Sequence, residues 1–380
     1  MFVFPWARET TEEREEFLMR KILVAVLALV LTLSMGSVAF ADFAPVNKED
    51  LKVGVVYIGD VSDKGYTYAH HQGILAMQEA LGLTDDQIII KRNVTEDAAC
   101  ETALRELVEQ GCQVIFGCSF GYMDYMAELA EEYPEVIFSH CSGYKSNETN
   151  FNNYFGRIYE ARYLAGIAAG LKTETNHLGY VAAMSLPEVN YSMDAYFMGA
   201  KSVNPDVKMT VKYTNTWYDP TLERQAADAL LDLGCDVIAQ HQDTAMPVIA
   251  AEEKGVWACG YNADMTEDAP KAHLVAPIWN WGVYYTEAVQ QVIDGTWKPE
   301  NVLLGMKEGL CALSPISENC AEGTKEKIAE VEEQILSGEF GVFEGPITDN
   351  EGNVQVAEGV TLTPEEILQV NWLCEGITVG

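Results

Sequence analysis

The chain has 380 residues, a hydrophobic fraction of 48% that is ordinary for a globular protein, and a formal net charge of −34 at pH 7. So large a negative charge repels nucleic acid and anionic lipid, which excludes both as partners. The length indicates two domains, since single hydrophobic cores rarely grow beyond about 250–300 residues.

The N-terminal segment has the pattern of a secretory signal peptide. Residues 20–41 contain a basic pair, an apolar run at 22–33 and an A-x-A cleavage site that ends at Ala41. The apolar run is too short for a membrane anchor. Met19 is the predicted true start, so we interpret residues 1–41 as an upstream extension followed by the signal peptide. No cysteine follows the small residues of the cleavage site, and we therefore expect a protein that is periplasmic or secreted, without a lipid anchor.

From residue 51 onward, short apolar runs alternate with stretches of helical periodicity. In the first half, the predicted strands and helices are, in chain order, 53–58, 68–81, 88–91, 95–110, 113–117, 122–132 and 136–140. Alternation of this kind is typical of a parallel sheet that is covered by helices on both faces.

The same pattern begins again in the second half. The predicted elements there are 178–183, 193–202, 207–213, 221–233, 236–240, 244–254, 256–260 and 274–277. The stretch "DLGCDVIAQ" repeats the order of "EQGCQVIFG", with a helix end, a glycine, a cysteine and a strand. Two similar lobes are therefore predicted, and the helix at 163–172, which is rich in small residues, suits the place where the chain crosses between them.

The C-terminal part contains further helices and a hairpin. Helices are predicted at 283–294 and 324–337, and a hairpin turn at 349–352 between two short strands. A last helix begins with Thr363 as its cap and Pro364 in its first turn.

The cysteine count limits the disulfide pattern. Nine cysteines make an odd number, so at least one thiol stays free or pairs outside the chain. No C-x-x-C spacing occurs, and no metal site is predicted. Cys118 and Cys141 each follow a predicted strand and are candidates for neighbours at one sheet edge. The favoured interpretation is that the thiols pack as small buried hydrophobic groups.

Residues that follow the strands indicate where a ligand binds, since open α/β sheets bind ligands beyond the carboxyl ends of their strands. These positions combine flat aromatic rings with hydrogen-bonding side chains. The aromatic members are Tyr66, Phe120, Trp217, Trp279 and Trp281, and the polar members are Ser119, Gln240, His241, Asp243, Asn262 and Asp264. Stacking faces together with edge hydrogen bonds suit a flat heteroaromatic ligand. No G-x-S-x-G, H-E-x-x-H or Walker lysine is present, so neither catalytic residues nor a cofactor are predicted.

Several stretches of the chain match the pattern of a known family when they are taken together. They include "VGVVYIGDVSDKGYTYAHHQGI", "YLAGIAAGLKTETNHLGYVAA", "YTNTWYDP" and "PKAHLVAPIWNWGVYYTEAV". In aggregate they resemble the basic membrane protein family of substrate-binding proteins, over about residues 50–348. The resemblance implies a type I periplasmic-binding-protein fold, with two Rossmann-like lobes of parallel sheet joined by a three-strand hinge. The implied N-terminal lobe comprises 50–160 and 280–348, the C-terminal lobe 161–279, and a tail with a helix 349–380.

The resemblance also implies a function. Members are extracytoplasmic binding proteins of ABC importers, so the expected partners are a purine ligand and a membrane permease, with a monomer as the expected state. In nucleoside-binding members an aromatic in a D-K-S-F-N pattern stacks on the base, and Tyr66 matches it here, with Thr67 in place of the asparagine. The second stacking aromatic precedes an aspartate, and Trp217 in "TWYD" matches that one.

Two departures from the family pattern change the expected ligand. The aspartate that holds ribose in G-V-D-x-D-Q is replaced by Asn262, and the ribose-binding lysine is replaced by Trp279. A buried carboxylate without its ribose partner would be costly, so its absence favours a bare purine nucleobase of the adenine type. The complete predicted ligand-binding set is Tyr66, Thr67, His70, Ser119, Phe120, Trp217, His241, Asn262, Asp264 and Trp279.

Three other readings stay open at this point. The ligand is alternatively a purine nucleoside or another flat heterocycle such as a flavin precursor. The same pocket would also serve a chemoreceptor-coupled binding protein without a permease. The least favoured alternative is an enzyme that acts on purines, with His140 or His241 as its base.

Overall fold

The computed structural model describes residues 43–380, which form one compact unit. The proposed signal peptide and its cleavage site at Ala41 lie outside these residues. None of the helices within 43–380 is both long and apolar enough to cross a membrane.

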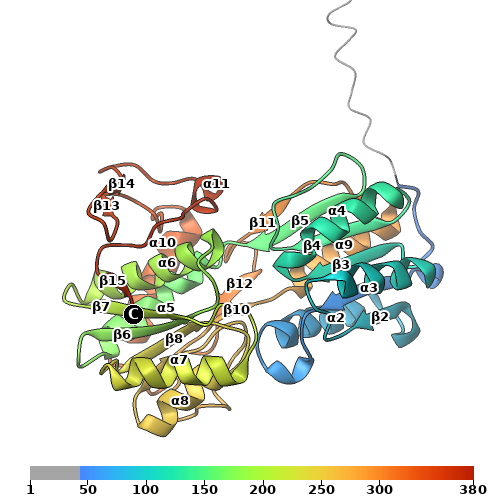
Figure 1. Ribbon diagram of the computed structural model, residues 1–380. Coiled ribbons are helices and arrows are strands. Elements are labelled where there is room, and N and C mark those ends of the chain that lie inside the picture. The colour runs from blue at the N-terminus through green and yellow to red at the C-terminus, as the bar shows by residue number, and fades with distance from the viewer. Residues whose placement is uncertain (1–42) are drawn as a thin grey trace, which may run out of the picture. The chain divides into compact units, whose positions relative to one another are not determined.

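The first lobe is a six-stranded parallel sheet with the strand order β11-β5-β4-β3-β1-β2 (Figure 1). Its strands are β1 (Val53–Tyr57), β2 (Ile88–Lys91), β3 (Val114–Cys118), β4 (Ile137–Cys141), β5 (Phe151–Gly156) and β11 (Val302–Leu304). Its helices are α2 (Tyr66–Leu81), α3 (Ala98–Glu109), α4 (Met123–Glu132) and α9 (Gly282–Asp294). In β1, Val55 joins the core cluster that contains Ile74 of α2, while Val56 joins the cluster that contains Leu104 of α3. Successive residues of a strand point to opposite faces, so this apolar run is buried on both sides.

The second lobe is a five-stranded parallel sheet with the order β15-β7-β6-β8-β9. Its strands are β6 (His177–Ala182), β7 (Lys208–Tyr213), β8 (Val237–His241), β9 (Trp257–Cys259) and β15 (Ile377–Val379). The accompanying helices are α5 (Tyr159–Lys172), α6 (Pro187–Val203), α7 (Pro220–Asp232) and α8 (Met246–Lys254). A Cβ on Gly166 would overlap the carbonyl oxygen of Tyr196, and one on Gly199 would overlap that of Tyr163. The small residues of α5 therefore let it pack backbone to backbone on α6.

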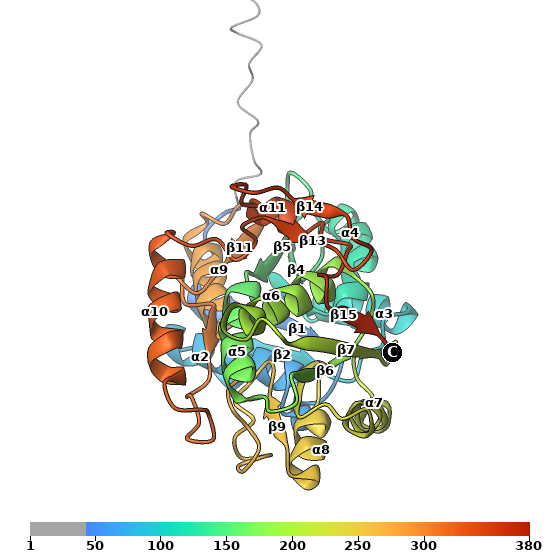
Figure 2. The same cartoon turned by 90° about the vertical axis from the view of Figure 1, so that its left-hand side faces the viewer.

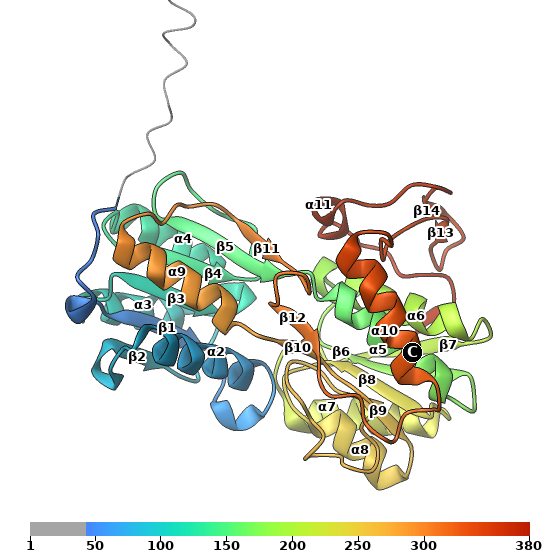
Figure 3. The same cartoon turned by 180° about the vertical axis from the view of Figure 1, so that it is seen from behind.

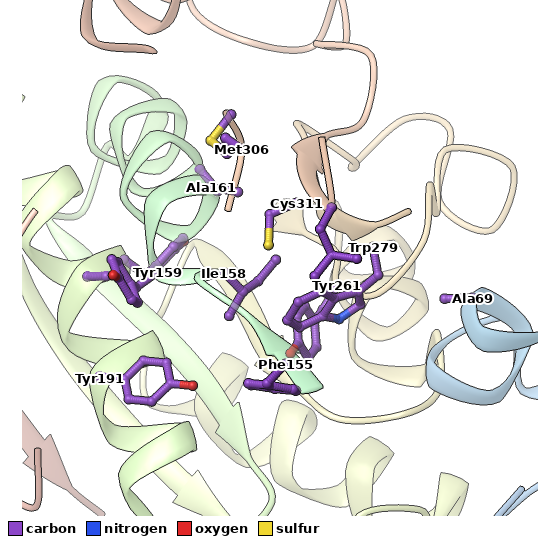
Figure 4. Close-up of a cluster of buried hydrophobic side chains, with 14 of the residues drawn as sticks. Ala69, Phe155, Ile158, Tyr159, Ala161, Tyr191, Tyr261, Trp279, Met306 and Cys311 are labelled. Carbon is purple, nitrogen blue, oxygen red and sulfur yellow. The ribbon is translucent and has the colours of Figure 1, made fainter. Parts of the chain in front are cut away.

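The chain passes between the two sheets three times: from β5 to α5, from β10 to α9, and from β11 to β12. Strands β10 (Pro277–Trp279) and β12 (Cys311–Leu313) pair antiparallel and lie between the two sheets (Figure 3). Apolar side chains fill this crossing region (Figure 4), where the ring of Phe155 packs 5.1 Å from that of Trp279. The observed architecture is the predicted one, two parallel α/β lobes joined by a three-part connection.

Most predicted elements are right to within a few residues, and the differences have local causes. Helix α2 begins two residues before the predicted start, because the Asp63 carboxylate accepts hydrogen bonds from the backbone N–H groups of its first turn. Helix α3 begins after Asp97, whose side chain accepts from the N–H of Ala99, and not at Thr95. Strand β5 was not predicted, because two polar residues, Asn152 and Asn153, interrupt its apolar pattern.

The C-terminal segment packs on the second lobe. Residues 280–348 were expected in the first lobe, but α10 (Thr324–Ser337) packs against α5 of the second lobe. In the expected tail, 349–380, β15 pairs with β7 of the second lobe (Figure 2). The part of the chain that returns to the first lobe therefore ends before residue 348. Of residues 280–348, only α9 and β11 lie with the first sheet. The hairpin of β13 (Ile347–Thr348) and β14 (Val354–Val356) and the short helix α11 (Pro364–Ile367) with its Thr363 cap are as predicted.

Candidate functional site

A small cavity lies between the lobes, beyond the carboxyl ends of both sheets. The first lobe lines it with Tyr66, Ser119, Phe120 and Ser142, and the second lobe with Glu188, Trp217, His241, Asp243 and Tyr261.

Tyr66 forms part of the first wall and is held firmly. It is the first residue of α2, whose start is capped by Asp63: the carboxylate accepts from the N–H groups of Gly65 at 2.9 Å and Thr67 at 2.8 Å. The phenol of Tyr66 donates to Sγ of Cys141 at 3.5 Å. The ring of His70 meets it edge-on, with the centroids 4.4 Å apart. Tyr66 therefore presents a preorganised ring to the cavity.

Trp217 lines the same cavity from the second lobe. It lies in the loop between β7 and α7, and its carbonyl oxygen accepts the N–H of Asp243 at 3.3 Å. Its ring centroid is 6.3 Å from that of His241. The structure thus brings the two expected stacking aromatics, Tyr66 and Trp217, to one cavity from separate lobes.

Two carboxyl groups give the second wall its polar character. Burial raises the pKa of Glu188 to about 7, and the hydrogen bond from Ser142 offsets part of that rise. Burial raises the pKa of Asp243 well above its usual value, and the nearby carboxylates of Asp63 and Glu223 add to the shift. Asp243 is 5% exposed, and within residues 43–380 no side chain donates a hydrogen bond to its carboxylate.

The first wall also offers an acceptor. The hydroxyl of Ser119 donates to Glu96 at 2.6 Å, and Glu96 further accepts from the N–H of Gly121 at 2.7 Å. Because the hydroxyl proton of Ser119 is engaged, its oxygen faces the cavity as an acceptor. Together with Glu188 and Asp243, this makes a site rich in acceptors, which suits a ligand that carries N–H donors.

A buried arginine lies behind the second wall. The guanidinium of Arg162 stands 3.6 Å from the ring centroid of Tyr261 and donates to the carbonyl of Gln240 at 2.8 Å. Burial lowers the pKa of His241 well below its usual value, and the positive charge of Arg162 lowers it further. His241 is therefore neutral at physiological pH, 3.6 Å from Glu188.

Five of the ten predicted ligand-binding residues do not line the cavity. Thr67 lies behind it at the start of α2, and His70 stacks on Trp281 with its Nδ1 2.6 Å from the hydroxyl of Tyr285. Asn262 and Trp279 hydrogen-bond to each other: the indole N–H donates to Oδ1 at 3.0 Å. Asp264 is exposed and accepts from the N–H of Thr266.

Four lining residues are outside the predicted ligand-binding set: Ser142, Glu188, Asp243 and Tyr261. Asp243 was among the polar residues noted at the strand ends, but it was left out of that set. Ser142, Asp243 and Tyr261 follow β4, β8 and β9 by one or two residues, and Glu188 lies in the first turn of α6, the helix that follows β6. The rule that ligands bind beyond strand ends therefore points to them. The resemblance to nucleoside-binding relatives directed the selection to Asn262 and Trp279 instead.

Several known proteins are similar in sequence to this chain. The model of a family described as ABC transporter substrate-binding protein PnrA-like matches residues 50–342. A purine-binding protein of Brucella abortus is 37% identical over 93% of this chain and 98% of its own length. A putative ABC transporter glucose-binding protein of Haloferax volcanii is 38% identical over 81% of this chain and 78% of its own length.

The fold is shared with solved structures at lower identity. An ABC transporter solute-binding protein from Aeropyrum pernix superposes with a TM-score of 0.67 at 20% identity, over 79% of this chain and 93% of that one. This likeness concerns the fold alone, and it confirms the predicted type I architecture.

Proposed function

This chain belongs to the family of PnrA-like ABC transporter substrate-binding proteins, and from that premise we propose that it binds an adenine-like purine nucleobase between its lobes. Proteins of this family hold a small molecule for a membrane permease and perform their role outside the cytoplasm. The observation that supports the purine is the cavity itself, which combines aromatic side chains from both lobes with an excess of hydrogen-bond acceptors.

The aromatic walls favour a planar ligand. Tyr66 and Phe120 line one side of the cavity and Trp217 and Tyr261 the other. Stacking of a base on an aromatic side chain contributes about 1–3 kcal/mol. One of the two similar relatives is named as purine-binding and the other as glucose-binding, and both are about equally similar to this chain, so their names do not decide which ligand it binds. The aromatic rings that line the cavity from both lobes favour a purine over glucose.

The acceptors favour the amino-substituted base. Adenine carries an exocyclic amino group and an imidazole N–H, both donors, which suit the carboxyl groups of Asp243 and Glu188 and the oxygen of Ser119. Hydrogen bonds from these donors favour the ionised form of the two carboxyl groups. The carbonyl oxygen of an oxopurine would face the same groups without offering a donor, which is costly in a buried site. No Lys or Arg is among the residues that line the cavity, so a nucleotide phosphate has no partner there.

The proposed cycle involves no chemical step. The ligand enters between the separated lobes, the lobes close on it, and the permease recognises the closed form. The enzyme alternative has little support at His140, which is fully buried with its Nε2 2.7 Å from the carbonyl of Ser119 and does not line the cavity. We further propose that the mature protein begins after Ala41 and acts as a monomer.

The test is the identity and the affinity of the ligand. Mass spectrometry of the small molecules released from freshly purified, denatured protein should detect adenine. Calorimetric titration should rank adenine above hypoxanthine, adenosine and glucose. A preference for adenosine of about tenfold over adenine, equal to 1.4 kcal/mol, would overturn the proposal.

A further inference from the structure

We propose that Gly65 determines how far the two lobes close, and thereby limits the size of the ligand that the cavity accepts. The ligand classes named below rest on the proposed function, while the contact between the lobes does not. Gly65 is the residue before α2, and it faces the backbone of Asp243 in the second lobe.

The contact at Gly65 has no room for a side chain. A Cβ on Gly65 would overlap the carbonyl oxygen of Asp243 and would lie 2.8 Å from its carbonyl carbon. Real Cβ contacts are essentially never shorter than 3.0 Å. Backbone cannot rotate aside as a flexible side chain can, and the N–H of Asp243 is bonded to the carbonyl of Trp217 at 3.3 Å. An added methyl group would therefore keep the lobes apart.

The position of this contact links it to the ligand. Gly65 precedes Tyr66, and Tyr66 and Asp243 both line the cavity. The contact therefore seals the cavity at an edge where the two walls meet. If the lobes stopped short, this edge would stay open to water, a small ligand would be less desolvated, and a larger one would gain room.

An ion pair next to the contact also joins the lobes. Nζ of Lys64 lies 2.7 Å from Oδ1 of Asp268, with the lysine side chain 57% exposed and the aspartate 11% exposed. Lys64 adopts a left-handed backbone conformation, with φ 57°, at the end of the short 3-10 helix Val61–Asp63. Neither residue lines the cavity, so this pair reports closure without touching the ligand.

The first experiment measures closure without reference to any ligand's identity. A zero-length carbodiimide joins a lysine to a carboxylate only at salt-bridge distance, and peptide mass spectrometry detects the Lys64–Asp268 product. We expect the cross-linked product in the native protein, both as purified and with adenine added. In Gly65→Ala we expect the fraction of closed molecules, and with it the yield of the product, to fall about tenfold. Gly59→Ala is the control, because its Cβ would meet only side chains of the same lobe, Thr67 Oγ1 at 3.0 Å and Asp63.

The second experiment measures affinity and size selection by calorimetry. We expect Gly65→Ala to weaken adenine about tenfold through the same loss of the closed state, and to weaken adenosine less. The melting temperature of the ligand-free protein should match that of Gly59→Ala, which separates a closure effect from misfolding.

The outcomes separate the two proposals. Native cross-linking and native adenine affinity in Gly65→Ala would overturn the inference, as would absence of the cross-link from the native protein in both conditions. The third outcome is that Gly65→Ala removes the cross-link, Gly59→Ala does not, and the native protein binds no purine. This result would support the inference and refute the proposed function.

Discussion

The two walls of the cavity are built by different means, although both lobes are parallel α/β sheets. In the first lobe, short-range contacts position the side chains: Asp63 caps the helix that carries Tyr66, and Glu96 holds Ser119. In the second lobe, the wall owes its character to buried charge. Glu188 and Asp243 face the cavity, and Arg162 lies behind Tyr261. The first wall thus positions its side chains through local hydrogen bonds. The second wall contributes carboxyl groups whose protonation depends on their burial.

The largest effect is expected from the second wall, in the pH dependence of folding. Burial raises the pKa of Glu188 from 4.5 to about 7, so between these values the folded protein holds a proton that the unfolded chain has released. Its contribution to stability is therefore lost as pH rises through this window, by up to about 3 kcal/mol, and does not change further above it. Glu188→Gln should reduce the loss of stability between about pH 5 and pH 8 by this amount, as measured by urea denaturation of ligand-free protein. The part due to Glu223, whose pKa burial also raises to about 7, should remain.

The control for that measurement is Glu339→Gln, an exposed position on the surface. It should shift the free energy of unfolding equally at both pH values. If Glu188→Gln did the same, the carboxyl of Glu188 would not be buried in the folded protein, and the contrast between the walls would be lost.

Asp243→Asn should weaken adenine binding by about 2–3 kcal/mol, because hydrogen bonds to charged groups contribute about that much. The amide brings a donor in place of an acceptor, so the loss for hypoxanthine should be smaller. Calorimetric titration of both bases measures the difference. Asp232→Asn, whose aspartate side chain is 77% exposed, should bind both bases as the native protein does. Equal losses for the two bases would contradict the role of Asp243 as an acceptor for the amino group.

Trp217→Ala should weaken adenine by about 2 kcal/mol through loss of stacking. Trp257→Ala serves as its control, because that ring packs under Lys172 and is absent from the residues that line the cavity. Fluorescence quenching on addition of adenine should also disappear in Trp217→Ala and persist in the control. Native affinity in Trp217→Ala would show that the second wall does not stack on the ligand.

The smallest effect is expected at the first wall. Tyr66→Phe keeps the ring and removes only the hydroxyl that donates to Cys141 at 3.5 Å. A neutral hydrogen bond contributes about 0.5–1.5 kcal/mol, and a bond to sulfur falls at the low end. Adenine affinity should therefore change by less than about threefold, while Tyr66→Ala should lose about as much as Trp217→Ala. A large effect of Tyr66→Phe would mean that the phenol itself contacts the ligand.

Local pattern predicted the fold well. The strands β1, β2, β3 and β4 and the helices that follow the first three were placed to within a few residues, because buried parallel strands and amphipathic helices have clear periodicities. The helix at 324–337 was predicted with its correct bounds, but its assignment to the first lobe was wrong. Which sheet a helix covers depends on contacts with α5, far away in the chain, and its own periodicity does not record them.

The candidate site was predicted less completely, for a similar reason. Tyr66 and Trp217 were found because each follows a strand and matches a family motif. Asn262 and Trp279 were selected by the same reasoning, yet they satisfy each other at 3.0 Å and do not line the cavity. No local sequence pattern distinguishes a polar side chain that is free to bind a ligand from one that is hydrogen-bonded to a side chain 17 residues away.

The sequence by itself determined the alternation of strands and helices, the family, and the aromatic residues that follow the strands, since these depend on neighbours along the chain. Only the tertiary structure decided which of those residues share the cavity, that Glu188 and Asp243 face it, and that Arg162 lies behind Tyr261. It also decided that Gly65 meets the backbone of Asp243. The physical reason is that burial, electrostatic shifts and the approach of two lobes depend on distances between segments far apart in the chain.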